Sequence, residues 1–157
     1  MPKNLPVSMS KTLKLTNVIM KKCEEEDLKD LQKTVIQMSN FIQSKGMKQV
    51  GPLIQRTGVE FDSDGNPQIA IWIMLQSSQF IQKIEKPYQI ESGVKVPDCL
   101  YVHYAGLESD MRVAYEKLHV CAYEEEINLS GDNYTVFINQ EDDMMTADIF
   151  MEKKLDE

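Results

Sequence analysis

The sequence has few of the residues that mark a disulfide-stapled, metal-bound or membrane-spanning protein. Its three cysteines have no CxxC spacing and an odd count, so they fit neither a disulfide framework nor a zinc ribbon. The two histidines have no ligand-like spacing, which argues against a metal site. No run reaches the ~18 apolar residues of a membrane span, and the N-terminus lacks the apolar core of a secretory signal. We expect a reduced, cytoplasmic protein with no cofactor, no metal and no membrane partner.

Motifs of nucleotide and serine-hydrolase chemistry are also absent, because no GxGxxG, GxxxxGK[ST] or GxSxG occurs. The chain carries 25 Asp and Glu against 17 Lys and Arg, for a net charge of −8. Phosphate backbones repel such a chain, so we expect no direct nucleic-acid binding. The same charge is compatible with a basic protein partner, although no segment localises that surface.

What is present indicates one globular domain. The chain has 157 residues, of which 42% are hydrophobic, and only 7 Gly and 6 Pro. A chain of this size can bury a hydrophobic core without disulfide bonds or a structural metal ion. Residues 1–12 are rich in polar residues and predict a flexible N-terminal arm. The single domain is expected over residues 13–157.

The same order of elements occurs twice: strand, helix, glycine, strand, polar turn, strand. Apolar residues at steps of three and four predict helices over residues 24–45 and 108–126. Strands are expected over residues 15–21, 53–61, 68–76, 99–105, 133–138 and 145–152. The halves, about 15–76 and 99–152, are therefore duplicated βαββ units. Together they predict an α+β fold, a mainly antiparallel sheet with two helices on one face and a ligand cleft on the other.

The last strand of each half has two different faces, because alternate side chains of a strand point in opposite directions. In the first half, one face is aliphatic (Ile69, Ile71, Ile73 and Leu75), and the other carries Trp72 and Met74. In the second half, Asp148 and Phe150 share the face away from the aliphatic one. An aromatic wall beside a carboxylate suits a lipophilic, cationic ligand. The alternatives are ordinary packing for Trp72 and a solvated surface position for Asp148.

Four stretches of the second half resemble the GyrI-like small-molecule-binding domain family. This family includes the effector-binding domains of AraC-type and MerR-type regulators. The stretches are Val102-His-Tyr-Ala-Gly106, Ala114-Tyr-Glu-Lys-Leu118, Gly131-Asp-Asn-Tyr-Thr-Val-Phe-Ile138 and Thr146-Ala-Asp-Ile-Phe-Met151. The resemblance covers residues 13–153. It implies two βαββ units around a cleft that holds lipophilic, often cationic molecules between aromatics and a buried acid. Because the first strand starts near residue 15, the chain is expected to be a stand-alone member without a helix-turn-helix segment.

One departure from the family concerns that buried acid. Several members carry Tyr-Glu where this chain has Tyr134-Thr135, and Asp148 is the acid that takes its place. By position, Thr135 and Phe137 are expected to line the cleft, in addition to Trp72 and Phe150.

Three functions follow, and the sequence does not choose between binding and catalysis. The first is a stand-alone binding protein for lipophilic, drug-like small molecules. The second, also implied by the resemblance, is a hydrolase of strained-ring, cyclopropane-bearing natural products. In it, Asp148 acts as acid or base, and Tyr104 or Tyr134 holds the developing charge. The third is an acidic protein antagonist of a toxic or DNA-acting partner.

Overall fold

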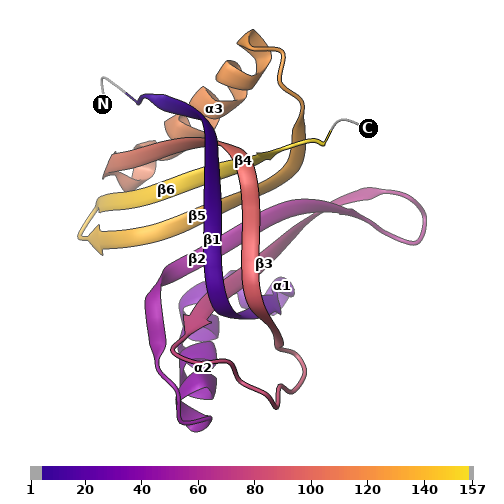
Figure 1. The fold of residues 1–157 in the computed structure, drawn as a ribbon, viewed down its shortest axis with the longest axis vertical. Helices are drawn as coiled ribbons and strands as arrows, with labels where there is room; N and C mark the ends of the chain where they lie inside the picture. Colours follow the sequence, from indigo (N-terminus) through magenta and orange to yellow (C-terminus); the bar gives the residue numbers. More distant parts are fainter. Residues whose placement is uncertain (1–4, 156–157) are drawn as a thin grey trace. The chain divides into compact units, whose positions relative to one another are not determined.

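The computed structural model describes residues 5–155, which form six strands, three α-helices and one short 3₁₀ turn (Figure 1). In chain order these are β1 (Val7–Lys22), α1 (Glu25–Lys29), α2 (Leu31–Ser44), β2 (Gln49–Phe61), β3 (Pro67–Ser77), β4 (Gln89–Leu107), the 3₁₀ turn η1 (Glu108–Asp110), α3 (Arg112–Glu124), β5 (Leu129–Glu141) and β6 (Met144–Lys153). The described chain divides into two compact units. The middle unit is Lys14–Lys95, and the terminal unit joins the residues up to Leu13 to those from Val96 onward.

The middle unit is an antiparallel sheet with α2 on one face. Strand β3 lies between β1 and β2, and Ile19 pairs with Leu75 in the register of β1 and β3. Met38 and Ile42 of α2 form one buried cluster with Ile73 and Leu75 of the sheet. Each such side chain, taken fully out of water, stabilises the fold by about 1.5–3 kcal/mol. The helix is therefore fixed to the sheet by the apolar face that its sequence predicted.

The helix expected over residues 24–45 is broken at Asp30. The backbone of Asp30 is not helical, and its side chain accepts a hydrogen bond of 3.1 Å from the Lys33 N–H at the start of α2. Asp is a strong helix N-cap, because its carboxylate satisfies an N–H that has no partner inside the helix. The result is a short α1 followed by α2, and the chain turns out of α2 at Gly46, with φ +79°, where the sequence predicted a stop.

The terminal unit repeats this arrangement with α3. Strand β6 lies between β4 and β5, and Ile149 faces both Val102 and Thr135 across the ladders. The buried core combines the even-numbered side chains of β4 with the apolar face of α3. Its members are Leu5, Leu100, Val102, Tyr104, Ala114, Leu118, Ala122, Ile149 and Met151. Residues 108–110, expected within the helix, form η1 instead, and α3 begins at Arg112.

The coarse prediction of an α+β fold is confirmed, since the described strands pair antiparallel within each unit and helices cover them. The count of helices differs, because residues 5–155 contain three α-helices and not two. The flexible arm over residues 1–12 is also not seen as such. Strand β1 starts at Val7, while residues 1–4 lie outside the described residues. Leu5 and Val7 pack on the core of the terminal unit, which orders a segment that is otherwise polar.

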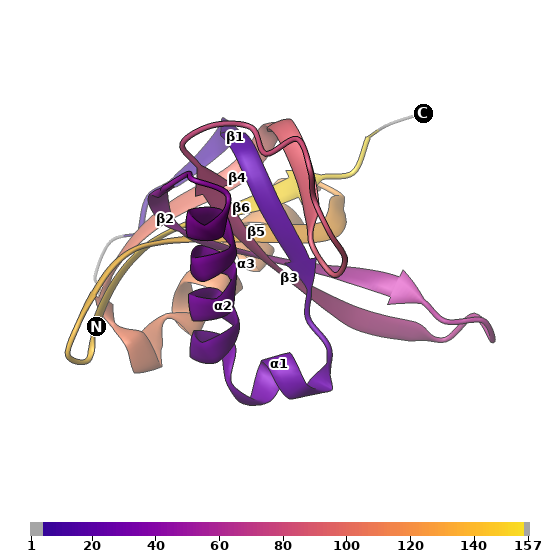
Figure 2. The same cartoon turned by 90° about the horizontal axis from the view of Figure 1, so that it is seen from below.

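The predicted hairpin turn joins β2 and β3. The Asp62 carboxylate accepts hydrogen bonds of 2.9 Å from the N–H groups of Asp64 and Asn66, which closes the turn. The turn projects well beyond α1 and α2 (Figure 2). Consequently Ile69, expected in the core face, is 75% exposed, because the aliphatic face continues past the end of the helix that covers it.

No helix in residues 5–155 is both long enough and apolar enough to span a bilayer.

Candidate functional site

The sheet of the terminal unit carries its polar chemistry on the face away from α3. Asp148 of β6 lies opposite His103 of β4 and Val136 of β5 in the two ladders. Phe150, two residues on, lies opposite Tyr101 and Tyr134. Cross-strand partners share a face. The strand register therefore brings Asp148, Phe150, Tyr101, His103 and Tyr134 onto one face of the sheet, on which Phe150 and Tyr134 are buried.

Asp148 is held by two side chains of β4. The Tyr101 hydroxyl donates to Asp148 Oδ1 at 2.6 Å, and His103 Nδ1 lies 2.7 Å from the same oxygen. The Asp148 side chain is 24% exposed and the His103 side chain 52% exposed. Hydrogen bonds to a carboxylate are about twice as strong as neutral ones. The carboxylate thus has a fixed position in a partly desolvated setting.

Aromatic rings adjoin this carboxylate. The rings of Tyr101 and Phe150 are 4.9 Å apart between centroids and tilted by 47°. The ammonium of Lys11, on β1, lies 4.6 Å from the centroid of the Tyr101 ring. Burial and the neighbouring Asp148 raise the pKa of the Tyr101 hydroxyl, so it stays a hydrogen-bond donor at neutral pH.

Tyr104, predicted to stabilise charge beside Asp148, is not on this surface. It lies on the opposite face of β4, fully buried in the core under α3, and its hydroxyl donates to the Leu107 carbonyl oxygen. The odd-numbered residues of β4 face Asp148 and the even-numbered ones face the helix. This alternation separates Tyr104 from the carboxylate.

Thr135 and Phe137 were expected to line the cleft, but they also lie on the α3 side. Thr135 pairs with Ile149 and Phe137 with Ala147, both core-facing positions of β6. The Thr135 hydroxyl is hydrogen-bonded to the hydroxyl of Tyr115 on α3. Burial raises the pKa of Tyr115, in agreement with a buried hydroxyl pair. Position 135 therefore packs beneath the helix and does not share a surface with Asp148.

Trp72 and Met74 belong to β3 of the middle unit. They lie on the face away from α2, because Ile73 and Leu75 take the face that α2 covers. Trp72 is half-buried, with Lys22 and Arg56 as its partners in the ladders, and Met74 is buried. Their role in ligand binding stays a prediction.

Sequence reasoning missed Tyr101 and His103. Both lie in the predicted strand over residues 99–105, where they alternate with core residues. The polar face of that strand was the pattern that could have identified them. Their significance depends on β4 pairing with β6 in the register that puts residue 103 opposite residue 148. That register comes from tertiary structure and not from local pattern.

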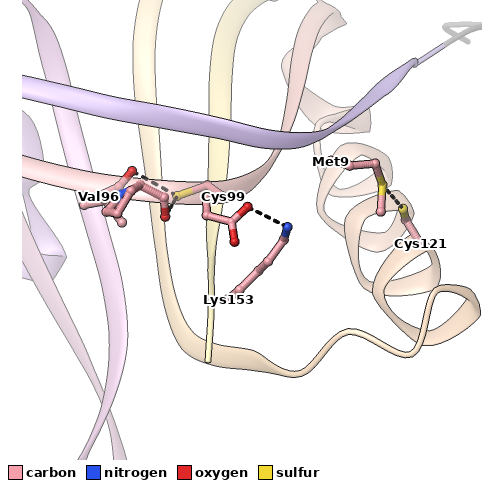
Figure 3. A network of polar contacts seen from close by, with 7 residues as sticks. Met9, Val96, Cys99, Cys121 and Lys153 are labelled. Carbon is pink, nitrogen blue, oxygen red and sulfur yellow. Dashed lines mark hydrogen bonds and ion pairs between the residues drawn. The ribbon is translucent and has the colours of Figure 1, made fainter. Parts of the chain in front are cut away.

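The three cysteines are free thiols. Cys99 is buried near the Val96 carbonyl, and Cys121 Sγ lies 3.7 Å from Met9 Sδ (Figure 3). Burial raises the pKa of the Cys99 thiol to about 11, which keeps it protonated and unreactive at neutral pH. Across residues 5–155, no three His, Cys, Asp or Glu side chains converge on a point where a metal ion would bind.

Comparison with known proteins gives structural likeness without sequence likeness. No family model matches the sequence, and no curated protein matches it. EcmrR, from its complex with DNA, has a TM-score of 0.67 at 12% identity. The match covers 96% of this chain and 57% of that one, so this chain spans little more than half the length of EcmrR.

Two other solved structures match along almost their whole length. A hydrolase from Listeria innocua encoded by lin2189 has a TM-score of 0.59 at 11% identity, covering 92% of this chain and 91% of that one. SAV2435 bound to tetraphenylphosphonium has a TM-score of 0.56 at 12% identity, covering 96% and 94%. At such identities the likeness establishes the fold alone. The chain shares its fold with these three proteins, and the α+β fold class predicted from the sequence agrees with this.

Proposed function

We propose that this protein binds lipophilic, cationic, drug-sized molecules, and that Asp148 is the anionic contact of the ligand. One observation carries the proposal: a carboxylate fixed by Tyr101 and His103 lies beside the Tyr101–Phe150 ring pair. Aromatic faces attract cations by about 0.5–2 kcal/mol, more when water is excluded. Ring area and a partly desolvated negative charge are what a lipophilic cation needs.

The negative charge of the Asp148 carboxylate is available to a ligand because the Tyr101 hydroxyl that binds it is neutral and does not cancel that charge. Tyr101 donates a neutral hydroxyl, and its raised pKa preserves this donation. Tyr134, opposite Phe150 in the ladder, lies on the same face of the sheet and is buried there. The binding of tetraphenylphosphonium by SAV2435, which has this fold, supports the proposal.

The direct test is calorimetric titration with tetraphenylphosphonium. We expect saturable binding, and a loss of about ten- to a hundredfold in affinity in Asp148→Asn, because the Coulomb attraction between the carboxylate and a partly desolvated cation a few ångströms away is on the order of 1.5–3 kcal/mol. Asp142→Asn is the matched control. It removes the same charge at the β5–β6 turn, where φ is +55° and Asn is well tolerated. Equal affinity in the two variants would refute the role of Asp148.

Trp72 fluorescence tests the rest of the predicted cleft. The sequence contains one tryptophan, so quenching by tetraphenylphosphonium reports on that position alone. Saturable quenching would support a ligand contact at Trp72 of the middle unit. Binding without any change in Trp72 emission would remove Trp72, and with it Met74, from the proposed ligand site.

The predicted hydrolase mechanism has a weaker basis in this geometry. It paired Asp148 with Tyr104 or Tyr134, and Tyr104 is enclosed in the core under α3. Tyr134 lies on the same face of the sheet as Asp148 but is also buried, so a strained-ring hydrolase would depend on a tyrosine with little exposure. The antagonist hypothesis keeps its original basis, the acidic charge of the chain, and would show as salt-dependent binding of a basic protein.

A further inference from the structure

We propose that His103 and Asp148 form a general-base dyad that hydrolyses aryl esters of small carboxylic acids. This activity goes beyond ligand binding, and it uses a residue that the predicted hydrolase mechanism did not include. The dyad rests on the 2.7 Å contact between His103 Nδ1 and Asp148 Oδ1.

The contact determines where the imidazole proton lies. An ionised carboxylate has no proton to give, so His103 Nδ1 must donate to Asp148. The neutral ring then has its lone pair on Nε2. Since Nδ1 is engaged and the side chain is 52% exposed, Nε2 is the ring nitrogen that meets water. Such an orientation is what a carboxylate contributes to histidine bases in hydrolases.

A second donor fixes the dyad. The Tyr101 hydroxyl binds Asp148 Oδ1 at 2.6 Å, so the carboxylate is anchored from β4 at positions 101 and 103 together. Both partners lie on regular strands, which hold side chains more firmly than loops do. The half-buried Tyr101 ring, which packs on the buried Phe150 next to the carboxylate, offers apolar area to an aryl group. This ring pair is the reason to expect an aromatic leaving group.

The reaction is a hydrolysis that consumes one water. As the water oxygen attacks the ester carbonyl carbon, His103 Nε2 takes one water proton and the carbonyl electron pair moves onto its oxygen. The tetrahedral intermediate then re-forms its carbonyl and breaks the bond to the aryloxide. The imidazolium returns the proton to the aryloxide, which leaves as a phenol, and the carboxylic acid is the other product. Asp148 balances the charge of the imidazolium throughout and needs no proton of its own.

The test is p-nitrophenyl acetate hydrolysis by the purified chain, and its control is built into the sequence. The chain has two histidines, His103 in β4 and His119, which is exposed on α3. We expect His103→Gln to remove the protein-dependent rate and His119→Gln to retain it. Equal losses in both variants, or no loss in His103→Gln, would overturn the dyad, because surface imidazoles hydrolyse this ester without any special setting.

The tautomer of His103 provides a readout that does not depend on activity. In the wild type, long-range proton–nitrogen NMR should find the hydrogen on Nδ1. In Asp148→Asn the new amide can donate to Nδ1 and so move the hydrogen to Nε2, and the rate should fall tenfold or more. A wild-type ring with its hydrogen on Nε2 would refute the proposal even if some hydrolysis were seen.

The outcomes separate this inference from the binding proposal. His103→Gln should lose hydrolysis, and cation binding is measured separately on the wild-type chain. A chain that binds the cation but shows no His103-dependent rate would overturn the dyad alone. A chain with that rate and no cation binding would overturn the binding proposal alone.

Discussion

The two units repeat one backbone plan but place opposite chemistry at the same point of it. In the middle unit, the central strand β3 presents Trp72 between Lys22 and Arg56. In the terminal unit, the central strand β6 presents Asp148 between His103 and Val136. One unit thus places an aromatic ring between two basic residues, and the other places an acid beside an imidazole. Both units keep the same backbone arrangement because each helix packs on an apolar sheet face. The opposite face of each sheet takes no part in that packing, so its residues can differ.

The helices show a second difference. The start of α1 is fixed by a reciprocal pair of hydrogen bonds between Glu24 and Asp27, and α2 begins at the Asp30 cap. The N-cap of α3 makes no side-chain hydrogen bond, and η1 precedes it. Instead, α3 is linked to its sheet from inside, by the Tyr115–Thr135 hydroxyl pair. The side-chain hydrogen bonds of the helices thus lie at the helix ends in the middle unit and at the helix–sheet interface in the terminal unit.

The largest expected effect tests whether the two cores are equivalent. Ile42→Ala in α2 and Leu118→Ala in α3 each remove a fully buried aliphatic side chain. Each should lower the free energy of unfolding by about 2–5 kcal/mol, because a cavity remains where the atoms were. Urea denaturation of both variants measures this. A loss below about 1 kcal/mol in only one of them would show that its helix is not part of a tightly packed core.

The next effect tests the interior link of the terminal unit. Thr135→Val leaves the Tyr115 hydroxyl without its partner and should cost about 1–3 kcal/mol. In the double variant Thr135→Val with Tyr115→Phe no polar group remains to be left unpaired, so much of the loss should be recovered. A double-mutant cycle by urea denaturation gives the coupling. Strictly additive losses would show that the hydroxyl pair contributes no coupling of its own.

A third effect tests the helix-end network of the middle unit. Burial acts to raise the pKa of Asp27, but hydrogen bonds from Lys21, the Glu24 N–H and Thr34 outweigh it and lower the pKa. A lowered folded-state pKa stabilises the fold above the unfolded value of about 3.9, and this stabilisation is lost as the pH falls through the folded value. Asp27→Asn should cost about 1 kcal/mol at pH 7 and lose less stability than wild type between pH 7 and pH 3. An unchanged difference between those two pH values would contradict the assignment.

The smallest effect concerns Lys11, a cationic side chain of the terminal unit itself. Lys11 lies over the Tyr101 ring, where a ligand cation would compete for the same aromatic face. Lys11→Gln should therefore tighten tetraphenylphosphonium binding about two- to fivefold, the equivalent of about 0.5–1 kcal/mol. Lys14→Gln, an exposed lysine of the same strand, is the matched control. Weaker binding in Lys11→Gln would show that this lysine supports the ligand and does not compete with it.

Much of the fold was predictable because the periodicities were strong. The steps of three and four from Leu31 to Ile42 correctly placed α2, and the alternation in residues 145–152 correctly placed both faces of β6. The break at Asp30 was not anticipated, since an apolar period continues across a cap. The exposure of Ile69 was not anticipated either, because the pattern does not say where the covering helix ends.

The candidate site was predictable in part, and the limit was register. Asp148 and Phe150 were found from the alternation of one strand. Their partners on β4 required the pairing of residue 103 with residue 148, which no local pattern specifies. The family resemblance placed Thr135 in the cleft, and this prediction was misleading for the same reason. Its ladder partner is Ile149, so it points toward α3, although its neighbour Tyr134 shares the Asp148 surface.

The division of the chain between the units has a consequence for synthesis. The middle unit is continuous in sequence, from Lys14 to Lys95, whereas the terminal unit takes its first segment from before Lys14 and the rest from after Lys95. Because chains emerge from the ribosome N-terminus first, the middle unit can be complete while the segment up to Leu13 still lacks its partners. The terminal unit must then close a loop across the whole middle unit. Closing a loop that long carries an entropic cost that a middle unit already folded would reduce. Vectorial folding would thus assemble the half that carries Asp148 last.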